Sequence, residues 1–391
     1  MIYFILGSHP ELSIAEIRAV LGDNYRPVFI SDSVLVIDSI DWNLGDLQNR
    51  LAGIVKIGRI AGELTTWDKT QVADLMASLA SGAAGKNKVS FGISVYDLGD
   101  KKMTRFLERD LDQLGLEIKK RLKETGRPVR YVKGKEPRLS SAVVETNGLL
   151  ESGGEFVLLA TTNTILIGQT EAIQNFKAWS DRDYGRPARD AKSGMLPPKL
   201  ARMMINLGGI DPHGATLLDP FCGSGTVLTE GVLMGFETLI GSDITPKAVA
   251  DTKTNMTWIV DRLNLSTPNL SLYVTPATEL PSVHSSLVDL LVTEVFLGNP
   301  RVKTLDQAEA RRLESELIPL FRDSFTSLAT LLKPTARAVV AFPAYKTKSG
   351  DWHRLSLKSL LQSLGYRILG NHLYYREDQF VARDIYVLTR K

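Results

Sequence analysis

The chain has 391 residues, of which 43% are hydrophobic and 23% charged, and its formal net charge is +3. This length predicts two or three domains, and the lack of an apolar run of about 18 residues argues against a membrane span. The single cysteine, Cys222, excludes an internal disulfide and a Cys-rich zinc site, and it favours a reducing cytoplasm. The five histidines are scattered, so no metal site is predicted.

Residues 1–50 predict a strand, a helix and a second strand. The opening stretch IYFILG is apolar and has no basic segment before it, so we expect a first strand and not a signal peptide. The stretch SIAEIRAVLG has an apolar stripe at helical spacing and ends at Gly22. The stretch SVLVID has the composition of a strand.

Residues 51–173 alternate between predicted strands and helices in an α+β pattern. Their charge is uneven, because residues 101–138 contain 13 Lys or Arg against 6 Asp or Glu. Such a surplus suits a phosphate backbone. The alternative is a solvated helix face, since residues 105–124 are amphipathic. The candidate RNA-binding side chains are Lys119, Lys120, Arg121, Lys133 and Arg138.

The second half of the chain has a different pattern of predicted elements. Residues 174–196 are rich in charge, glycine and proline, which predicts a linker. The proline pair at 197–198 then opens a predicted helix. From residue 215, apolar strands alternate with helices, and this predicts a doubly wound, mainly parallel sheet. The last two strands are separated by a short polar segment and are placed to pair antiparallel.

The stretch TLLDPFCGSGTVL, residues 216–228, predicts a strand, a glycine-rich turn and a helix start, which together bring the backbone close to a ligand. A phosphate-binding Walker loop requires Gly-Lys-Ser/Thr, but Thr226 follows Gly225 directly. A dinucleotide fingerprint requires a third glycine where Leu228 stands. We therefore favour a third candidate, S-adenosylmethionine, which carries an ammonium and a sulfonium.

Two acidic residues at the ends of consecutive predicted strands fit that cofactor. Asp219 ends the first strand, where an acid suits a cationic ligand. Asp243 ends the second, where a carboxylate suits a ribose diol, although it would also suit NAD. The alternatives are a turn residue before Pro220 for Asp219, and the N-terminal cap of a helix over 246–262 for Asp243.

Several stretches of the chain resemble one enzyme family. DPFCGSGT, residues 219–226, is similar to the first motif of class I methyltransferases that modify exocyclic amines of nucleobases. RDYGRPARDAKSGMLPPKLARMMINL, YYREDQFVARDIYVLTRK and the N-terminal YFILGSHPELSIAEIRAVL resemble the tRNA guanosine N2-methyltransferase family that acts near position 10. RLSSAVVETNGLL, residues 138–150, is similar to a THUMP domain, an RNA-binding module. The resemblance covers nearly the whole chain and keeps the domain order.

The resemblance implies roles for the matching residues. Asp219, Gly223 and Gly225 would hold the methionine half of S-adenosylmethionine, and Asp243 would bind its ribose. The helix from Pro197 would line the cofactor's outer side. The full set of implied cofactor residues is Asp219, Pro220, Phe221, Gly223, Gly225, Thr226, Asp243, Ile244 and Pro197. A charged loop for RNA would be formed by Arg182, Asp183, Arg186, Arg189 and Asp190, and its alternative is an interdomain ion-pair network.

The target-amine motif departs from the family. In DLLVTEVFLGNP, residues 289–300, the usual Asp-Pro-Pro-Tyr turn is replaced by a turn without prolines. Guanine N2 is a poor nucleophile, so a carboxylate and a backbone carbonyl must orient its lone pair toward the methyl group. Glu294 would be the acceptor, Val295 would supply the carbonyl, and Phe296 would stack on the flipped base. The alternatives are a solvated strand-end charge for Glu294 and a core contact for Phe296.

We therefore predict an α/β chain with a class I, Rossmann-like methyltransferase domain preceded by an α+β THUMP and ferredoxin-like RNA-binding region. The predicted parts are a ferredoxin-like segment at 1–50, a THUMP-like domain at 51–173, a charged linker at 174–196 and the methyltransferase domain at 197–391. The expected reaction is methylation of a guanosine N2 in tRNA. A catalytically impaired tRNA-binding paralogue or partner subunit, and a DNA amine methyltransferase, are the alternatives. The modified nucleotide, the number of methyl groups, the oligomeric state and a small activating protein subunit stay open.

Overall fold

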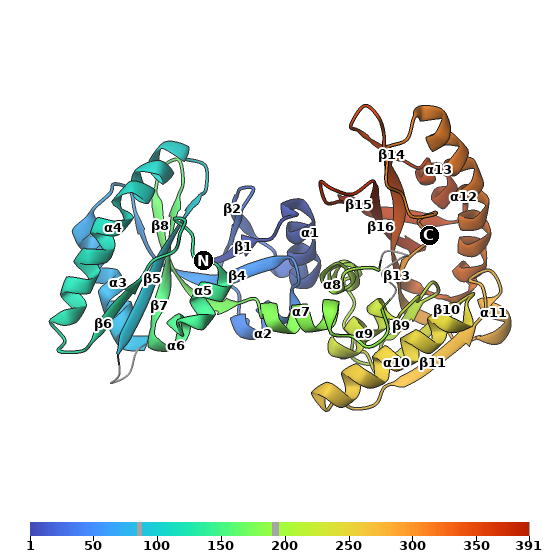
Figure 1. The fold of residues 1–391 in the computed structure, drawn as a ribbon, viewed down its shortest axis with the longest axis horizontal. Coiled ribbons are helices and arrows are strands. Elements are labelled where there is room, and N and C mark those ends of the chain that lie inside the picture. Colours follow the sequence, from blue (N-terminus) through green and yellow to red (C-terminus); the bar gives the residue numbers. More distant parts are fainter. Residues whose placement is uncertain (84–87, 190–194, 391) are drawn as a thin grey trace. The chain divides into compact units, whose positions relative to one another are not determined.

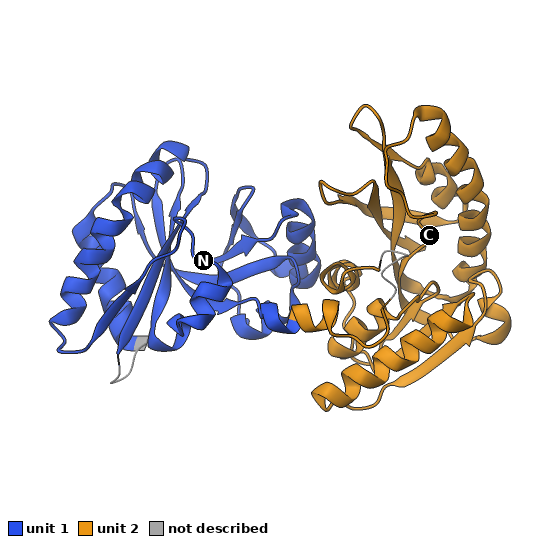
Figure 2. Ribbon diagram, in the orientation of Figure 1, with its two compact units in different colours: residues 1–178 blue, residues 179–391 orange. Residues whose placement is uncertain are grey.

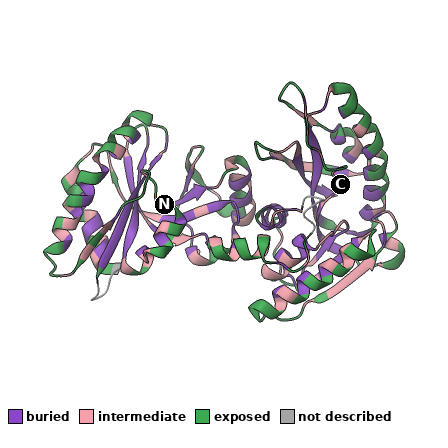
Figure 3. Ribbon diagram, viewed as in Figure 1, coloured by how far each residue is buried: buried purple, intermediate pink, exposed green. Residues whose placement is uncertain are grey.

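The computed structural model describes residues 1–83, 88–189 and 195–390, which form two compact units (Figures 1 and 2). The first unit spans Met1–Ala178 and the second Trp179–Lys391. Their boundary lies inside helix α7 (Phe176–Tyr184), within the segment predicted as a charged linker. Each unit is built around one β-sheet whose central strands are buried (Figure 3).

The described part of the first unit forms an eight-stranded mixed sheet in the order β2-β3-β1-β4-β8-β7-β5-β6. Its strands are β1 (Ile2–Leu6), β2 (Pro27–Ile30), β3 (Val34–Ile37), β4 (Ile54–Leu64), β5 (Val89–Asp97), β6 (Val129–Val132), β7 (Gly153–Ala160) and β8 (Ile165–Ile173). Its helices are α1 (Pro10–Leu21), the 3₁₀ turn η1 (Gly22–Asn24), α2 (Leu44–Arg50), α3 (Lys69–Ala83), α4 (Lys101–Lys123), α5 (Ser141–Thr146) and α6 (Leu149–Ser152).

The sheet of the first unit runs without interruption across the predicted segments 1–50 and 51–173. Strand β1 pairs antiparallel with β3 on one side and with β4 on the other. Helices α3 and α4 pack on the face formed by β5, β7 and β8, with Met76, Leu114 and Phe156 in one core cluster. The amphipathic sequence of α4 therefore buries one stripe and leaves its basic residues outside the core (Figure 3).

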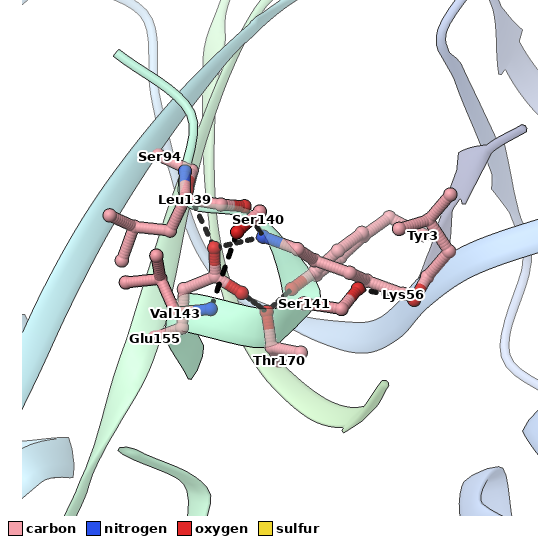
Figure 4. Close-up of polar contacts among 10 residues, drawn as sticks. Tyr3, Lys56, Ser94, Leu139, Ser140, Ser141, Val143, Glu155 and Thr170 are labelled. Carbon is pink, nitrogen blue, oxygen red and sulfur yellow. Dashed lines mark hydrogen bonds and ion pairs between the residues drawn. The ribbon is translucent and has the colours of Figure 1, made fainter. Parts of the chain in front are cut away.

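A buried ion pair ties four strands of this sheet to the segment before α5 (Figure 4). Lys56 on β4 pairs with Glu155 on β7, and the Lys56 ammonium also donates to the carbonyl of Leu139 at 2.5 Å. Glu155 accepts from the hydroxyls of Ser94 at 2.6 Å and Thr170 at 2.9 Å. Because both charges have hydrogen-bond partners, their removal from water is compensated.

The described part of the second unit also forms one sheet, in the order β11-β10-β9-β12-β13-β16-β15, with β14 paired to β13. Its strands are β9 (Thr216–Asp219), β10 (Thr238–Asp243), β11 (Asn269–Val274), β12 (Val288–Glu294), β13 (Leu332–Lys346), β14 (Trp352–Arg354), β15 (Tyr366–Tyr374) and β16 (Val381–Arg390). Its helices are α8 (Pro198–Leu207), α9 (Thr226–Leu233), α10 (Pro246–Leu263), α11 (Leu280–Val283), α12 (Gln307–Leu328), the 3₁₀ turn η2 (Ala329–Leu331) and α13 (Leu357–Ser363).

Strands β9 to β13 pair in parallel, whereas β16 is antiparallel to both of its neighbours. This confirms the predicted doubly wound sheet and the antiparallel pairing of the last two strands. The chain starts the sheet at β9, builds outward to β11, and then returns to place β12 on the other side of β9. The strand order therefore reverses between β9 and β12, which is the arrangement of a nucleotide-binding α/β fold.

Successive apolar side chains of these strands point to opposite faces of the sheet, and helices cover both faces. Leu217 is close to Gly231 of α9, and Leu290 is close to Gly208 at the end of α8. The next residues, Leu218 and Leu291, face the other way and belong to the core cluster shared with α12 and α13. Because successive strand residues point to opposite faces, the apolar strands serve two helical layers at once.

Candidate functional site

Two acidic side chains stand at the point where the strand order of the second sheet reverses. Asp219 is the last residue of β9, and Glu294 is the last residue of the neighbouring strand β12. In open α/β sheets, ligands bind outside the carboxyl ends of the strands at such a point. Both carboxylates line a cavity of about 390 Å³, which we call the first cavity. Its size is within the usual range for small-ligand sites.

Asp219 is almost fully buried, with 2% of its surface exposed. Its Oδ1 atom accepts hydrogen bonds from the hydroxyl of Thr293 at 2.6 Å and from the backbone N–H of Phe221 at 3.2 Å. Burial raises the pKa of the carboxyl to about 7, and the nearby acids Asp243 and Glu294 add to the rise. A cation bound in the first cavity would favour the charged form. Asp219 is therefore suited to a positively charged ligand.

The glycine turn after β9 brings backbone to the edge of the first cavity. Gly223 and Gly225 have φ angles of +51° and +82°, a region that L side chains rarely adopt. The N–H of Gly223 donates to Oδ2 of Asp243 at 3.1 Å, and its carbonyl accepts from the hydroxyl of Thr252 on α10 at 2.8 Å. A Cβ on Gly223 would meet no protein atom within 4 Å, whereas one on Gly225 would lie 2.8 Å from Thr252. Gly223 thus leaves room on the ligand side, and Gly225 allows close packing on the protein side.

The charge of the lining favours a cationic ligand. The first cavity is lined by the acids Asp219, Asp251 and Glu294, of which Glu294 is paired with Arg383. The basic group of the described lining, Lys247, forms an ion pair with Asp251. Phe221 adds an apolar surface. The residues present therefore fit S-adenosylmethionine, whose ammonium and sulfonium need carboxylates and whose adenosine needs an apolar wall.

The altered turn after β12 is held by contacts from neighbouring strands. Nε of Arg383 on β16 donates to Oε1 of Glu294 at 2.8 Å, and the two side chains are 6% and 14% exposed. The N–H of Val295 donates to the carbonyl of Ala341 on β13 at 3.2 Å. Further along, the hydroxyl of Tyr345 donates to the Leu297 carbonyl at 3.0 Å. Hydrogen bonds at Glu294, Val295 and Leu297 thus hold a turn that two prolines restrict in the related motif.

A second cavity, of about 530 Å³, is lined by Arg383, the partner of Glu294. The turn after β12 lines it with Leu297 and Gly298, and the segment before β16 lines it with Phe380 and Val381. Arg383 lines the second cavity and Glu294 lines the first, while Met195 borders both. Each cavity is therefore lined by one member of the ion pair, and each is large enough for a small ligand.

The predicted cofactor residues lie in and around the first cavity. Those that line it are Asp219, Phe221, Gly223 and Thr226. Pro220 and Gly225 belong to the same turn, and Asp243 supports that turn through its hydrogen bond to Gly223. Ile244 is 69% exposed, and Pro197 lines the second cavity. The structure thus brings the residues of the glycine turn together at the first cavity but not Pro197, and the role of each residue stays a prediction.

The predicted catalytic residues differ in their surroundings. Glu294 lines the first cavity, and Val295 is 2% exposed and hydrogen bonded to β13. Phe296 is 51% exposed, and the aromatic side chains that line the second cavity are Tyr184 and Phe380. The stacking role predicted for Phe296 thus has two other candidates in the structure.

Two of the three arginines predicted to bind RNA in the charged loop are packed inside the second unit. Arg182 donates to Glu230 on α9 at 2.7 Å, and Arg186 donates to the Thr226 hydroxyl at 2.6 Å. Arg186 is 6% exposed. Arg189 is exposed and lies over an aromatic ring. The packing favours an anchoring role for the first two arginines, and Asp190 lies outside the described residues.

The basic residues predicted to bind RNA in the first unit lie on α4 and on the segment after β6. Arg121 pairs with an acid of α3 and one of its own helix, and Lys133 pairs with an acid of α4. The guanidinium of Arg138 lies 5.1 Å from the ring centre of Tyr96. Lys119 is half-buried, and Lys120 is exposed. Their binding to RNA stays a prediction.

Four residues that line these cavities lie outside the set predicted from the sequence: Arg383, Lys247, Asp251 and Phe380. Lys247 and Asp251 follow the second acidic strand end by four and eight residues, in the first turns of α10, so their place in the sequence is a usable signal. Arg383 and Phe380 reach the site through the pairing of β16 with β13, which has no local signal. Within the described ranges, no cluster of three or more metal-binding side chains occurs, and no helix has the length and apolar content of a bilayer span.

The chain is similar to known methyltransferases in sequence. A family model described as "RMKL-like, methyltransferase domain" matches residues 186–260, from the charged loop through the glycine turn into α10. The tRNA (guanine(10)-N2)-dimethyltransferase of Methanothermobacter thermautotrophicus is 27% identical over 264 residues. This alignment covers 66% of the present chain and 68% of that relative. These matches agree with the family resemblance of the motifs.

Solved structures share the fold over the whole chain. The crystal structure of TrmN from Thermus thermophilus aligns with a TM-score of 0.55 and 16% identity, and the alignment covers 100% of both chains. The structure of SMU.472, complexed with SAH, aligns with a TM-score of 0.50 and 13% identity over 100% of this chain and 98% of that chain. At such low identity these neighbours support the fold alone, and they confirm the predicted Rossmann-like architecture.

Proposed function

We propose that this chain belongs to the tRNA guanosine N2-methyltransferase family and transfers a methyl group from S-adenosylmethionine to the N2 amine of a guanosine in tRNA. The observation that carries the proposal is that the carboxylates of Asp219 and Glu294 line the same cavity, at the point where the strand order of the sheet reverses. One carboxylate is suited to a cationic cofactor, and the other faces the same cavity from the strand that carries the target-amine motif. The sequence relative named above supports the same substrate.

The chemistry requires positioning more than acid–base catalysis. The bound cofactor supplies an electrophilic methyl group on a sulfonium, and the sulfur keeps the electron pair of the broken C–S bond. Asp219 and the glycine turn would hold the charged end of the cofactor. Glu294 would accept one N–H of the guanine amine, which keeps the nitrogen lone pair directed at the methyl carbon, and would take up the proton that N2 loses after transfer. The carbonyl of Val295 would accept the second N–H.

The second cavity is the proposed place for the target base. A base in a folded tRNA must leave its stack before its exocyclic amine can reach the methyl donor. Phe380 and Tyr184 offer rings for the flipped base. Glu294 lines the cofactor cavity and Arg383 lines this space, so the amine would be presented at the ion pair, where both ligands would meet.

The first unit is the proposed tRNA-binding module. Its α4 and the segment after β6 carry the local surplus of basic residues, and Lys120 and Arg138 are exposed. Such a surface binds phosphates and A-form shape without reading the base sequence. The similarity of residues 138–150 to a THUMP domain points the same way. A cytoplasmic location would follow from a tRNA substrate.

The proposal is tested by methyl transfer from labelled S-adenosylmethionine to unmodified tRNA transcripts. We expect transfer by the wild type and a loss of orders of magnitude with Asp219→Ala and with Glu294→Ala, because each removes a positioning group. Glu237→Gln, which changes an exposed acid of the same unit, is the control and should keep the wild-type rate. Mapping of the product would name the nucleotide. Binding of tRNA without any transfer by the wild type would contradict the proposal and favour a binding protein that has lost catalysis.

A further inference from the structure

The ion pair between Glu294 and Arg383 joins side chains from two strands, β12 and β16, that are separated by β13 in the sheet. Glu294 on β12 is paired in register with Ala341 on β13, and Arg383 on β16 is paired with Pro343. Since Ala341 and Pro343 are two residues apart, their side chains lie on the same face of the sheet. The guanidinium therefore reaches across β13, about 10 Å or two strand spacings, to place its Nε 2.8 Å from Glu294.

Arg383 is nearly buried, yet only part of its hydrogen-bonding capacity is used. A guanidinium has five N–H donors. Among the residues that the structure describes, the hydrogen bond from Nε to Glu294 is the one that the Arg383 side chain makes. The side chain is 6% exposed, and it lines the second cavity. Donors on the two terminal nitrogens are therefore left for a ligand in that cavity, and a buried cation with free donors favours an acceptor oxygen.

Guanine presents a matching set of groups on one edge. Its Watson–Crick edge carries the N2 amine and the N1–H, which are donors, followed by O6, which is an acceptor. A carboxylate next to a guanidinium is the complementary pair, because the first only accepts and the second only donates. Adenine has an amine in place of O6, so the guanidinium would face a second donor. Arginine contacts to guanine oxygen are a frequent means of base selection in other settings.

We propose that Arg383 is a specificity-determining residue that donates to O6 of the target guanine, while Glu294 accepts from N2. The proposal rests on the proposed function, since it concerns the base in the same reaction. Arg383 would then act twice, by holding the Glu294 carboxylate in place through Nε and by reading the base through its terminal nitrogens. The chain would select guanine by this pair.

The test replaces O6 and the arginine independently. Transcripts are assembled with either guanosine or 6-thioguanosine at the nucleotide that the wild type methylates. Sulfur keeps the N1–H and the N2 amine but is a weaker acceptor than oxygen. Methyl transfer is measured as kcat/KM for wild type and Arg383→Met. Arg367→Met, an exposed arginine on β15, is the matched control.

For wild type we expect guanosine to be preferred over 6-thioguanosine by roughly tenfold or more, the size of a hydrogen bond from a charged donor. Arg383→Met should lower kcat/KM for guanosine by roughly ten- to a hundredfold and bring the two bases close to equal. The Arg367→Met control should keep both the rate and the preference. A simple structural role for Arg383 would lower both rates and leave their ratio unchanged.

Each outcome decides a different point. The same base preference in wild type and Arg383→Met would overturn the inference while leaving the proposed function intact. No transfer by wild type to any transcript would overturn the proposed function and the inference with it. If Arg383→Met fails to fold, as judged by loss of S-adenosylhomocysteine binding, Arg383→Lys decides. Lysine keeps the charge beside Glu294 but loses the fork of donors, so the preference should still fall.

Discussion

Replacing Asp219 by asparagine should stabilise the ligand-free second unit increasingly as the pH rises from about 4 to about 7, and it should weaken cofactor binding. An Asp carboxyl ordinarily titrates at 3.8, whereas burial raises the pKa of Asp219 to about 7. The folded state then holds the proton more tightly than the unfolded state does. The protonated carboxyl therefore makes its full contribution to the free energy of unfolding below the unfolded pKa of 3.8. That contribution is lost as the pH rises through the folded pKa of about 7.

The size of the effect follows from the same shift. Each pH unit between the two pKa values corresponds to about 1.4 kcal/mol, so an ionised Asp219 costs about 4 kcal/mol of unfolding free energy at pH 8. Asparagine keeps an acceptor oxygen for the Thr293 hydroxyl and the Phe221 N–H but carries no charge. The stabilisation by Asp219→Asn should grow with pH up to about 7 and then stay constant.

The assay is the free energy of unfolding of wild type and variant across pH, read from hydrogen exchange of β9 and β12 peptides in a denaturant series. The difference between the two proteins isolates Asp219 from the other titrating groups. Asp261→Asn, at an exposed position on α10, is the control and should give a difference that does not depend on pH. A pH-independent difference for Asp219→Asn as well would refute the reasoning. Calorimetry of S-adenosylmethionine binding should show weaker binding by the variant, because the buried carboxylate is gone.

Two further predictions concern the first unit. Lys56→Met leaves Glu155 buried without its cation and should lower the free energy of unfolding by about 3–5 kcal/mol in a urea titration, whereas Lys56→Met with Glu155→Leu should recover most of the loss; equal losses in both variants would contradict this. Lys120→Ala should weaken tRNA binding and reduce the slope of log affinity against log salt by about one, as measured by filter binding. An unchanged slope would place the tRNA phosphates elsewhere.

The glycine turn and its acid could be predicted from the sequence because their signals are local. The apolar strand, the acid at its end and the two glycines four and six residues after that acid are neighbours in the sequence, so the local backbone alone brings them together. Asp219 and Gly223 line the first cavity for that reason. The alternation of strands and helices after residue 215 likewise predicted the parallel part of the sheet.

The base-binding side of the site could not be predicted in the same way. Arg383 is 89 residues from Glu294 in the sequence, and the two meet because β16 enters the sheet antiparallel beside β13. A shift of the β16 register by one residue would turn Arg383 to the opposite face of the sheet. Phe380 depends on the same register, whereas Phe296 is predicted from its place as the aromatic residue of the motif. Local patterns do not contain information about such long-range pairing.

The changed turn is more informative together with Arg383 than by itself. In the usual motif, an aspartate is followed by prolines, whose rings restrict the φ angles of the turn. Here the acid is longer by one methylene, and a longer side chain has more rotamers to lose when it is ordered. A buried hydrogen bond from a guanidinium fixes the end of that side chain directly, so backbone restriction by proline is no longer needed. The glutamate, the missing prolines and Arg383 therefore form one consistent solution, in which the amine grip is ordered from the neighbouring strands instead of from within the turn.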